Sequence, residues 1–224
     1  MKETAPQQTT LPTPRTAPEK LLAAAEGIVL REGGHAVTIR GIARASGLNS
    51  ALVSYHFGGV DALLARLVEL NVDAVCDARE VCVREALAVR TNASRLEALV
   101  RAYLDPLWRT RAIWHPGAAR TVIRGLMPLV DPTLRRRAVE RINLSVEQSQ
   151  EPLLELLPHL DRDTLQLRLQ LLAGAADELR LRAHEMGLFP LQGATPAGHD
   201  EPLRDELMVL ALTSLRAKPS PVST

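Results

Sequence analysis

The 224-residue sequence predicts an all-α protein. Leucine, alanine and arginine dominate the composition and aromatic residues make up only 3% of it, so good helix formers outnumber the residues that strands favour. Apolar residues also recur at helical spacing, as in Leu63, Leu64, Leu67 and Leu70. With 46% hydrophobic residues the chain can bury a real core, and its length falls between one large domain and two small ones.

Charge and cysteine content limit the classes of function. The net charge of +1 does not by itself indicate nucleic-acid binding, and residues 15–60 carry five basic side chains against three acidic ones. Cys76 and Cys82 are about 9 Å apart along one predicted helix, which excludes a disulfide, and no neighbouring ligands indicate a metal site. We expect two buried thiols in a reduced, cytoplasmic protein, because the sequence has no signal peptide and no membrane-spanning apolar run.

The N-terminal region begins with an arm and a first helix. Residues 1–16 are rich in threonine, glutamine and proline and have almost nothing apolar to bury, so we expect this arm to be disordered. The helix begins near Pro18, which suits a first-turn position, and ends at Gly33 and Gly34. Its apolar face comprises Leu21, Leu22, Ala25, Ile28 and Val29.

The segment from Thr38 to Phe57 predicts a helix-turn-helix. The Thr38 hydroxyl can cap one short helix, and Asn49 can cap the next. The small Ala43 lets the two helices approach, and Gly47 permits the positive φ that the turn requires. The residues expected in the core are Ile42, Leu48, Val53 and Phe57.

The remainder of the chain predicts longer helices. The first starts near Asp61 and runs to about Val89, so it is expected to bridge the small module and the rest. Further helices are expected over residues 94–110, 118–127, 131–155, 161–186 and 202–216, with Pro152 kinking or ending the third of these. The predicted domains are a disordered arm (1–16), a helix-turn-helix domain (17–60), a helical regulatory and dimerisation domain (61–218) and a disordered tail (219–224).

The helix-turn-helix segment resembles the N-terminal domain of TetR-family regulators. The matching positions are Thr38, Ile39, Arg40, Ile42, Ala43, Gly47, Asn49, Tyr55, His56, Phe57, Asp61, Ala62, Leu63 and Leu64. Beyond residue 70 the resemblance rests on chain length and helical pattern. At two places the sequence departs from the family: Val60 stands where a phosphate-anchoring lysine is common, and Gly34 and His35 stand where an aromatic residue is usual.

The resemblance implies that the third helix lies in the major groove of an operator. The side chains then expected at base edges are Ser50, Ala51, Leu52 and Ser54, which suit thymine methyl groups and close approach. Arg40 is the expected guanine reader, and Arg44 either contacts phosphate or stays solvated. The expected phosphate donors are Thr38, Asn49, Tyr55 and His56, although Tyr55 and His56 have the alternative of packing within the module.

The resemblance further implies a homodimer, a palindromic operator and release of a repressor by a small-molecule effector. The apolar stripes expected at the dimer interface, with an intramolecular core as the alternative, are Leu165, Leu169, Leu172, Ala173 and Ala176, and Leu207, Leu210, Ala211 and Leu215. The small residues 173–176 would allow close helix approach. The candidate effector-pocket residues are Tyr103, Trp108, Trp114, His115 and Arg124.

Two alternative functions make different demands on the sequence. A helical-bundle enzyme needs Glu-x-x-His motifs or paired inward carboxylates, or else a nucleophile motif such as GxSxG, and the sequence has none of them. We therefore expect no catalytic residues, metal or cofactor. The second alternative keeps the fold without small-molecule control, as a constitutive repressor, an activator or a module that answers to a protein partner.

Overall fold

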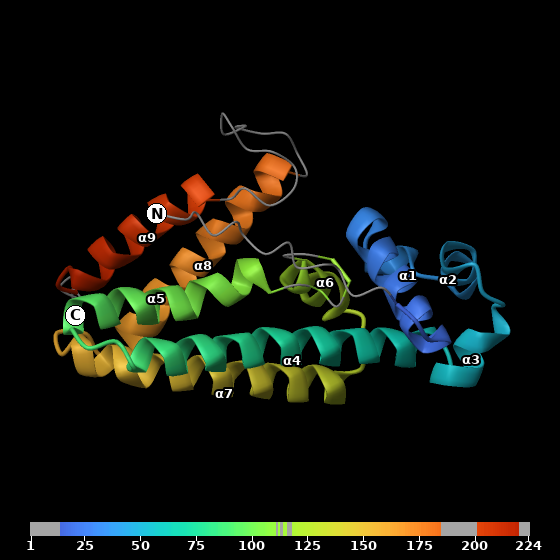
Figure 1. The fold of residues 1–224 in the computed structure, drawn as a ribbon, viewed down its shortest axis with the longest axis horizontal. Coiled ribbons are helices and arrows are strands. Elements are labelled where there is room, and N and C mark those ends of the chain that lie inside the picture. The colour runs from blue at the N-terminus through green and yellow to red at the C-terminus, as the bar shows by residue number, and fades with distance from the viewer. Residues whose placement is uncertain (1–13, 111, 113, 116–117, 185–200, 220–224) are drawn as a thin grey trace, which may run out of the picture. The chain divides into compact units, whose positions relative to one another are not determined.

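The computed structural model describes residues 14–110, 112, 114–115, 118–184 and 201–219. Within these residues it is helical and contains no strand, as the sequence predicts (Figure 1). The helices are α1 (Ala17–Glu32), α2 (Ile39–Ser46), α3 (Ala51–Phe57), α4 (Val60–Leu87), α5 (Asn92–Arg109), α6 (Ala119–Leu126), α7 (Pro132–Leu156), α8 (Arg162–His184) and α9 (Glu201–Arg216). The predicted arm (1–16), apart from residues 14–16, and residues 220–224 of the predicted tail lie outside the described residues.

Capping residues explain most of the helix starts. Thr16 forms a capping box with Glu19 at α1, and Thr91 accepts a hydrogen bond from the Ser94 main-chain N–H at α5. Asp131 accepts hydrogen bonds from two N–H groups in the first turn of α7, and Asp161 accepts one at α8. The predicted helices therefore exist, with ends that differ by a few residues.

Pro152 lies inside α7, which continues to Leu156. The alternative that this proline ends the helix is therefore wrong.

The chain divides into two compact units. Unit 1 comprises Met1–Val72 and Arg111–Arg136, and unit 2 comprises Asp73–Thr110 and Arg137–Thr224. Unit 1 thus adds the first part of α4 and all of α6 to the predicted helix-turn-helix domain. The division falls inside α4. This helix is continuous, and its residues up to Val72 belong to unit 1 and the rest to unit 2.

The core of unit 1 forms around α1. The apolar face predicted for this helix is buried, and Ile42 and Val53 are fully buried as expected. Leu48 and Phe57, also predicted in the core, are half-buried. Because Ile42 belongs to α2 and Val53 to α3, their burial fixes which faces of those helices turn outwards.

Gly34, one of the departures from the TetR pattern, lies where the chain after α1 meets α6. A Cβ atom built on Gly34 would lie 2.6 Å from the Gly125 carbonyl oxygen and 2.7 Å from a methyl group of Leu129. No side chain fits there unless α6 moves, so glycine at this position permits the close approach of α6.

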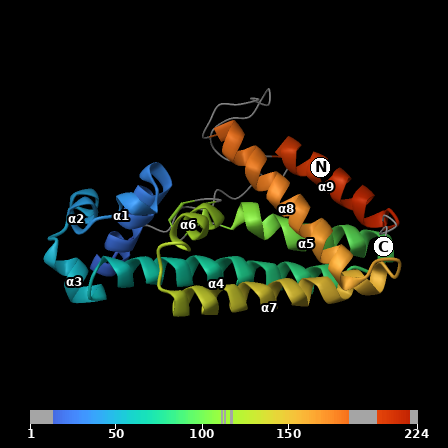
Figure 2. The ribbon, with the colours of Figure 1, turned by 180° about the vertical axis from the view of Figure 1, so that it is seen from behind.

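The core of unit 2 contains the residues expected at a dimer interface. Figures 1 and 2 show α8 and α9 side by side. The buried members of the two predicted stripes are Leu165, Leu169, Ala173, Leu207, Ala211 and Leu215. Leu172 is half-buried and packs against the same core, Leu210 is 58% exposed, and the side chain of Ala176 lies outside the described residues. The stripes were therefore assigned wrongly, because most of their residues form an intramolecular core.

The two cysteines differ in burial. Cys76 is fully buried, its thiol faces the Arg141 carbonyl oxygen at 3.7 Å, and burial raises the pKa of this thiol. Cys82 is half-buried, which corrects the expectation of two buried thiols.

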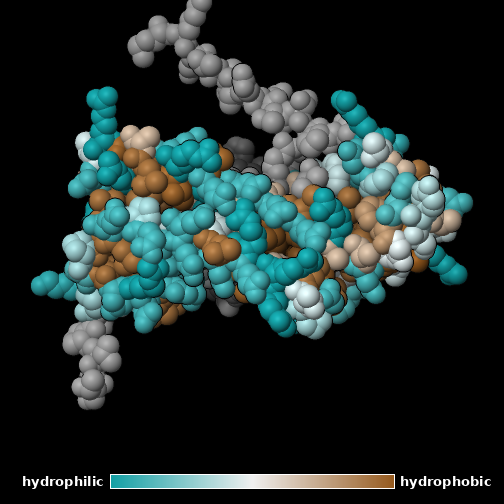
Figure 3. All heavy atoms as spheres, turned by 90° about the horizontal axis from the view of Figure 1, so that it is seen from below, coloured by the Kyte–Doolittle hydropathy of each residue, from teal (hydrophilic) through white to brown (hydrophobic). Residues whose placement is uncertain are grey.

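Within the described residues, no single helix is long and apolar enough to cross a membrane. Taken together, α3 and α4 would be long and apolar enough, but the two helices are bent by 57° relative to each other. On the face drawn in Figure 3, hydrophilic side chains surround separate apolar areas.

Candidate nucleic-acid interface

The turn between α2 and α3 is held by hydrogen bonds from its own polar residues. The Thr38 hydroxyl accepts from the Gly41 N–H at 3.0 Å, as predicted for the α2 cap. At the end of α2, Gly47 has a φ of 69°, and Ser46 donates to the Ala43 carbonyl at 3.2 Å. The Leu48 N–H then donates to the same carbonyl at 3.2 Å. The predicted helix-turn-helix is confirmed, with Gly47 in the left-handed conformation that its turn requires.

The start of α3 also depends on a short polar side chain. The Asn49 side-chain oxygen accepts from the Ala51 N–H at 2.9 Å, and the Asn49 carbonyl accepts from the Leu52 N–H at 3.1 Å. Asn49 therefore satisfies a free N–H group of the first turn, although regular α-helix begins two residues later.

The outer face of α3 is accessible. The exposed residues on or beside it are Asn49, Ser50, Ala51, Ser54, Tyr55 and His56. Leu52 is half-buried, and Val53 on the opposite face is fully buried. Of the four side chains of this segment predicted at base edges, Ser50, Ala51 and Ser54 are therefore exposed and Leu52 is half-buried.

Tyr55 and His56 do not pack within the module. Tyr55 is 80% exposed, and its ring stands edge-on to that of His56 with centroids 4.9 Å apart. Their hydroxyl and imidazole groups are consequently available to a partner outside the chain.

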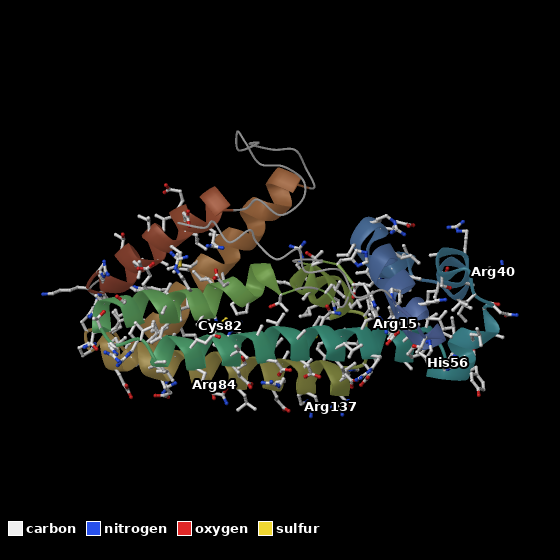
Figure 4. The ribbon with its side chains drawn as sticks, viewed as in Figure 1. Arg15, Arg40, His56, Cys82, Arg84 and Arg137 are labelled. Atoms are coloured by element: carbon white, nitrogen blue, oxygen red, sulfur yellow. The ribbon has the colours of Figure 1, made fainter. Side chains whose placement is uncertain are left out.

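The side chains of two arginines, Arg40 and Arg44, are exposed on α2. Arg40 projects from α2, and Figure 4 shows it together with His56 of α3. Within the described residues, neither Arg40 nor Arg44 makes a hydrogen bond or an ion pair through its side chain. Val60, in place of the lysine usual in the family, is the half-buried first residue of α4.

The candidate effector residues are divided between the two units. Tyr103 is buried in unit 2, where the Arg79 guanidinium lies over its ring at 5.6 Å. Trp114 and His115 belong to unit 1, as does the exposed Arg124. The side chain of Trp108 lies outside the described residues.

Sequence reasoning missed two buried charged residues. Glu26 is fully buried in α1 and accepts hydrogen bonds from the Trp114 N–H at 2.9 Å and from Nδ1 of His115 at 2.7 Å. Arg79 is 2% exposed, and it donates to the Ser145 hydroxyl at 3.1 Å. The sequence held a signal for the burial of Glu26, because this charged residue falls beside Leu22 and Ala25 on the apolar face of a predicted helix.

Comparison with known proteins agrees with this geometry. Residues 21–67 match the family model described as bacterial regulatory proteins, tetR family. The fold is similar to that of PfmR, a TetR-family regulator from Thermus thermophilus, with 15% identity, a TM-score of 0.60, and coverage of 92% of this chain and 99% of that one. A TetR-family regulator from Bordetella parapertussis has 16% identity and a TM-score of 0.61, with coverage of 89% of this chain and 92% of that one. SCO3833 of Streptomyces coelicolor, a TetR-family member, has 22% identity and a TM-score of 0.57, with coverage of 93% and 94%. No curated protein matches the chain in sequence.

The fold and the exposed face of α3 are those of a helix-turn-helix domain, the class of domain that places a short helix in the major groove of DNA. Both the pattern of residues 38–64 and the family match lie in its N-terminal part. Residues 21–67 therefore match the N-terminal part of the TetR family, and the fold is similar to that of solved TetR-family regulators.

Proposed function

We propose that the protein is a homodimeric repressor that binds a palindromic operator and leaves it when a small molecule binds. The observation that carries the proposal is the outward face of α3, which is exposed and polar and is held by the buried Val53 behind it. A short helix of this kind fits the major groove, and two such helices related by a dimer axis match a palindrome.

Roles within the interface follow from side-chain chemistry. We assign contacts with base edges to Ser50, Ala51, Leu52 and Ser54. Arg40, near the start of α2, is assigned a contact with a guanine. The proposed phosphate donors are Thr38, Asn49, Tyr55 and His56.

We expect Arg40→Ala to weaken operator binding by about 1–3 kcal/mol and to relax preference at one base pair of each half-site. The measurement is binding of the variant to duplexes that differ at single positions. Tyr55→Phe should instead weaken binding to all these duplexes equally, since it removes a proposed phosphate contact. Equal weakening on every duplex by Arg40→Ala would show that Arg40 contacts phosphate and that its base-reading role is wrong.

The dimer is assigned to the exposed faces of α8 and α9. The large apolar side chains exposed there are Leu167, Leu171, Val209 and Leu210, each more than half exposed. Leu167 and Leu171 are one helical turn apart, and a Cβ built on Gly174 would meet nothing within 4 Å, so this face of α8 is open. A second copy of the same face would cover these side chains by two-fold symmetry.

We expect Leu171→Asp to raise the dimer dissociation constant by about 100-fold, because it would bury an unpaired carboxylate at the interface. Sedimentation equilibrium measures the change. The matched control is Leu144→Asp in α7, a leucine 56% exposed that lies outside the proposed interface, which should leave the dimer intact. If both variants weaken the dimer equally, or if neither weakens it, the assignment of the dimer interface to α8 and α9 is wrong.

The proposed effector control is supported by polar groups inside unit 2. Arg79, Tyr103 and Ser145 meet in its interior, and a site for a small molecule combines apolar walls with a few such groups. Because α4 continues from unit 1 into unit 2, a ligand that favours one orientation of this helix would alter the separation of the two α3 helices. Half-sites one turn of DNA apart require a separation near ~34 Å, so a change of a few ångströms would lower affinity.

A further inference from the structure

A groove of about 740 Å³ lies beside α1 in unit 1. Its walls are one face of α1, the end of α2 and the segment that precedes α6. That segment contributes Trp114 and His115, two residues that the sequence indicated for an effector pocket. Both residues therefore line a groove of the unit that contains the helix-turn-helix, and not a site in unit 2.

The face of α1 in the groove is apolar in its middle and cationic at both ends. Its residues, which follow one another at helical spacing, are Lys20, Ala23, Ala24, Gly27 and Arg31. Ala45 of α2 adds another small apolar side chain to the wall. At a rise of ~1.5 Å per residue, Lys20 and Arg31 are about 16 Å apart along the helix axis. The groove thus has room between its charges for the body of a small molecule.

Two nitrogen-bearing side chains meet at the Arg31 end of the groove. A Cβ built on Gly27 would lie 3.0 Å from Nη1 of Arg31 and 3.8 Å from Cε1 of His115, so the guanidinium and the imidazole lie beside the same residue. The His115 ring is 40% exposed, and its Nδ1 lies 2.7 Å from the buried carboxylate of Glu26. A ligand in the groove would therefore meet this ring through its other nitrogen, Nε2.

The charge of the groove is suited to an anion. Lys20 and Arg31 are exposed, and within the described residues neither makes an ion pair or a hydrogen bond through its side chain. A guanidinium group can bind both oxygens of one carboxylate, and the alanines beside it can hold an apolar body attached to that carboxylate. These features fit an organic acid better than an inorganic anion, which would leave the apolar wall uncovered.

We propose that this groove binds a small organic acid, whose carboxylate contacts Arg31 and His115 and whose apolar body lies over Ala23 and Ala24. The site belongs to unit 1 and is separate from the effector site proposed in unit 2. A ligand there would touch α1 and the segment before α6 together, at the place where Glu26 already joins them. Since α1 also packs against α2 and α3, the ligand would bind directly to the helix that supports the helix-turn-helix.

Calorimetric titration of the full-length protein with benzoate tests the site, because benzoate joins a carboxylate to an apolar ring. Two matched compounds separate these contributions: benzyl alcohol keeps the ring without the charge, and acetate keeps the carboxylate without the ring. Each should bind at least about tenfold more weakly than benzoate. Arg31→Ala should raise the dissociation constant of benzoate about tenfold, since it removes a charge-assisted contact.

Two further variants distinguish a shaped groove from a charged surface. Ala24→Leu keeps every charge and introduces a good helix former, but its side chain would fill the apolar part of the groove, so it should also weaken benzoate binding about tenfold. Arg66→Ala is the matched control, because it removes one positive charge from an exposed arginine of α4 in the same unit, and it should leave benzoate affinity unchanged. Urea denaturation of each variant checks that its fold is retained.

The proposed site is wrong if wild type does not bind benzoate, or if Arg31→Ala and Ala24→Leu bind it as tightly as wild type does, which would place benzoate elsewhere in the protein. Equal losses in Arg31→Ala and Arg66→Ala would also contradict it, because affinity would then follow net charge. If Ala24→Leu does not fold, the comparison of Arg31→Ala with Arg66→Ala decides alone. None of these titrations contains DNA, so their failure and a failure of operator binding are separate results.

Discussion

Gly34→Ala is expected to lower the free energy of unfolding by about 3 kcal/mol, at the upper end of the range for overpacked sites. The added methyl group would lie 2.6 Å from the main-chain oxygen of Gly125 and within 3 Å of two leucine side chains. A main-chain atom cannot move without its helix, so α6 would have to shift away from the chain that follows α1. Urea denaturation of the purified variant measures the loss.

The control for this substitution is Gly27→Ala in the neighbouring α1. There a Cβ would lie 3.0 Å from the end of the flexible Arg31 side chain, which can turn away. Alanine is also the better helix former, so the control should be neutral or more stable by up to about 1 kcal/mol. Similar stability changes in the two variants would show that α6 does not pack closely on Gly34.

Glu26→Ala is expected to destabilise the protein by about 3 kcal/mol, because hydrogen bonds to a buried charged group are among the stronger ones. The substitution leaves the buried N–H of Trp114 without its acceptor and removes the partner of the His115 ring. Glu26→Gln is the matched variant, since its amide oxygen can still accept one hydrogen bond, and it should lose clearly less. Denaturant unfolding followed by tryptophan fluorescence gives both values.

The same pair of variants has an outcome that would contradict this account. If Glu26→Ala and Glu26→Gln are both as stable as wild type, the segment before α6 is not anchored by this carboxylate. If only the tryptophan signal of Glu26→Ala shifts while its stability is retained, the contact exists without contributing to the fold.

Local signals explain why the helix-turn-helix was predictable from the sequence. The Thr38 cap, the left-handed Gly47 and the Asn49 contact to α3 each involve residues within a few positions of one another. The order and approximate ends of the helices followed from similar short-range patterns. The exposed face of α3 followed from the same periodicity, because Val53 at its back is apolar.

Long-range packing explains what the sequence did not reveal. Glu26 and His115 are 89 residues apart, and no local pattern reports their pairing. Gly34 was visible as a departure from the family, but its reason lies in α6. Both contacts place residues 111–136 in unit 1, which a division by sequence order could not show.

The assignment of α8 failed for a different physical reason. This helix carries one apolar set at Leu165 and Leu169 and another at Leu167 and Leu171. Periodicity identifies both sets, yet only the tertiary packing decides which of them is buried.

In the proposed complex with DNA, α2 and α3 present the outer face of α3 to base pairs. The direct measurement is selection of bound sequences from a random DNA pool, done in parallel with wild type and with Ser54→Arg, a substitution at an exposed position of α3. We expect wild type to enrich a motif of two inverted half-sites, and the variant, while equally stable, to change the preferred base at one position of each half-site. Enrichment of no motif by wild type, or of the same motif with equal affinity by the variant, would contradict it.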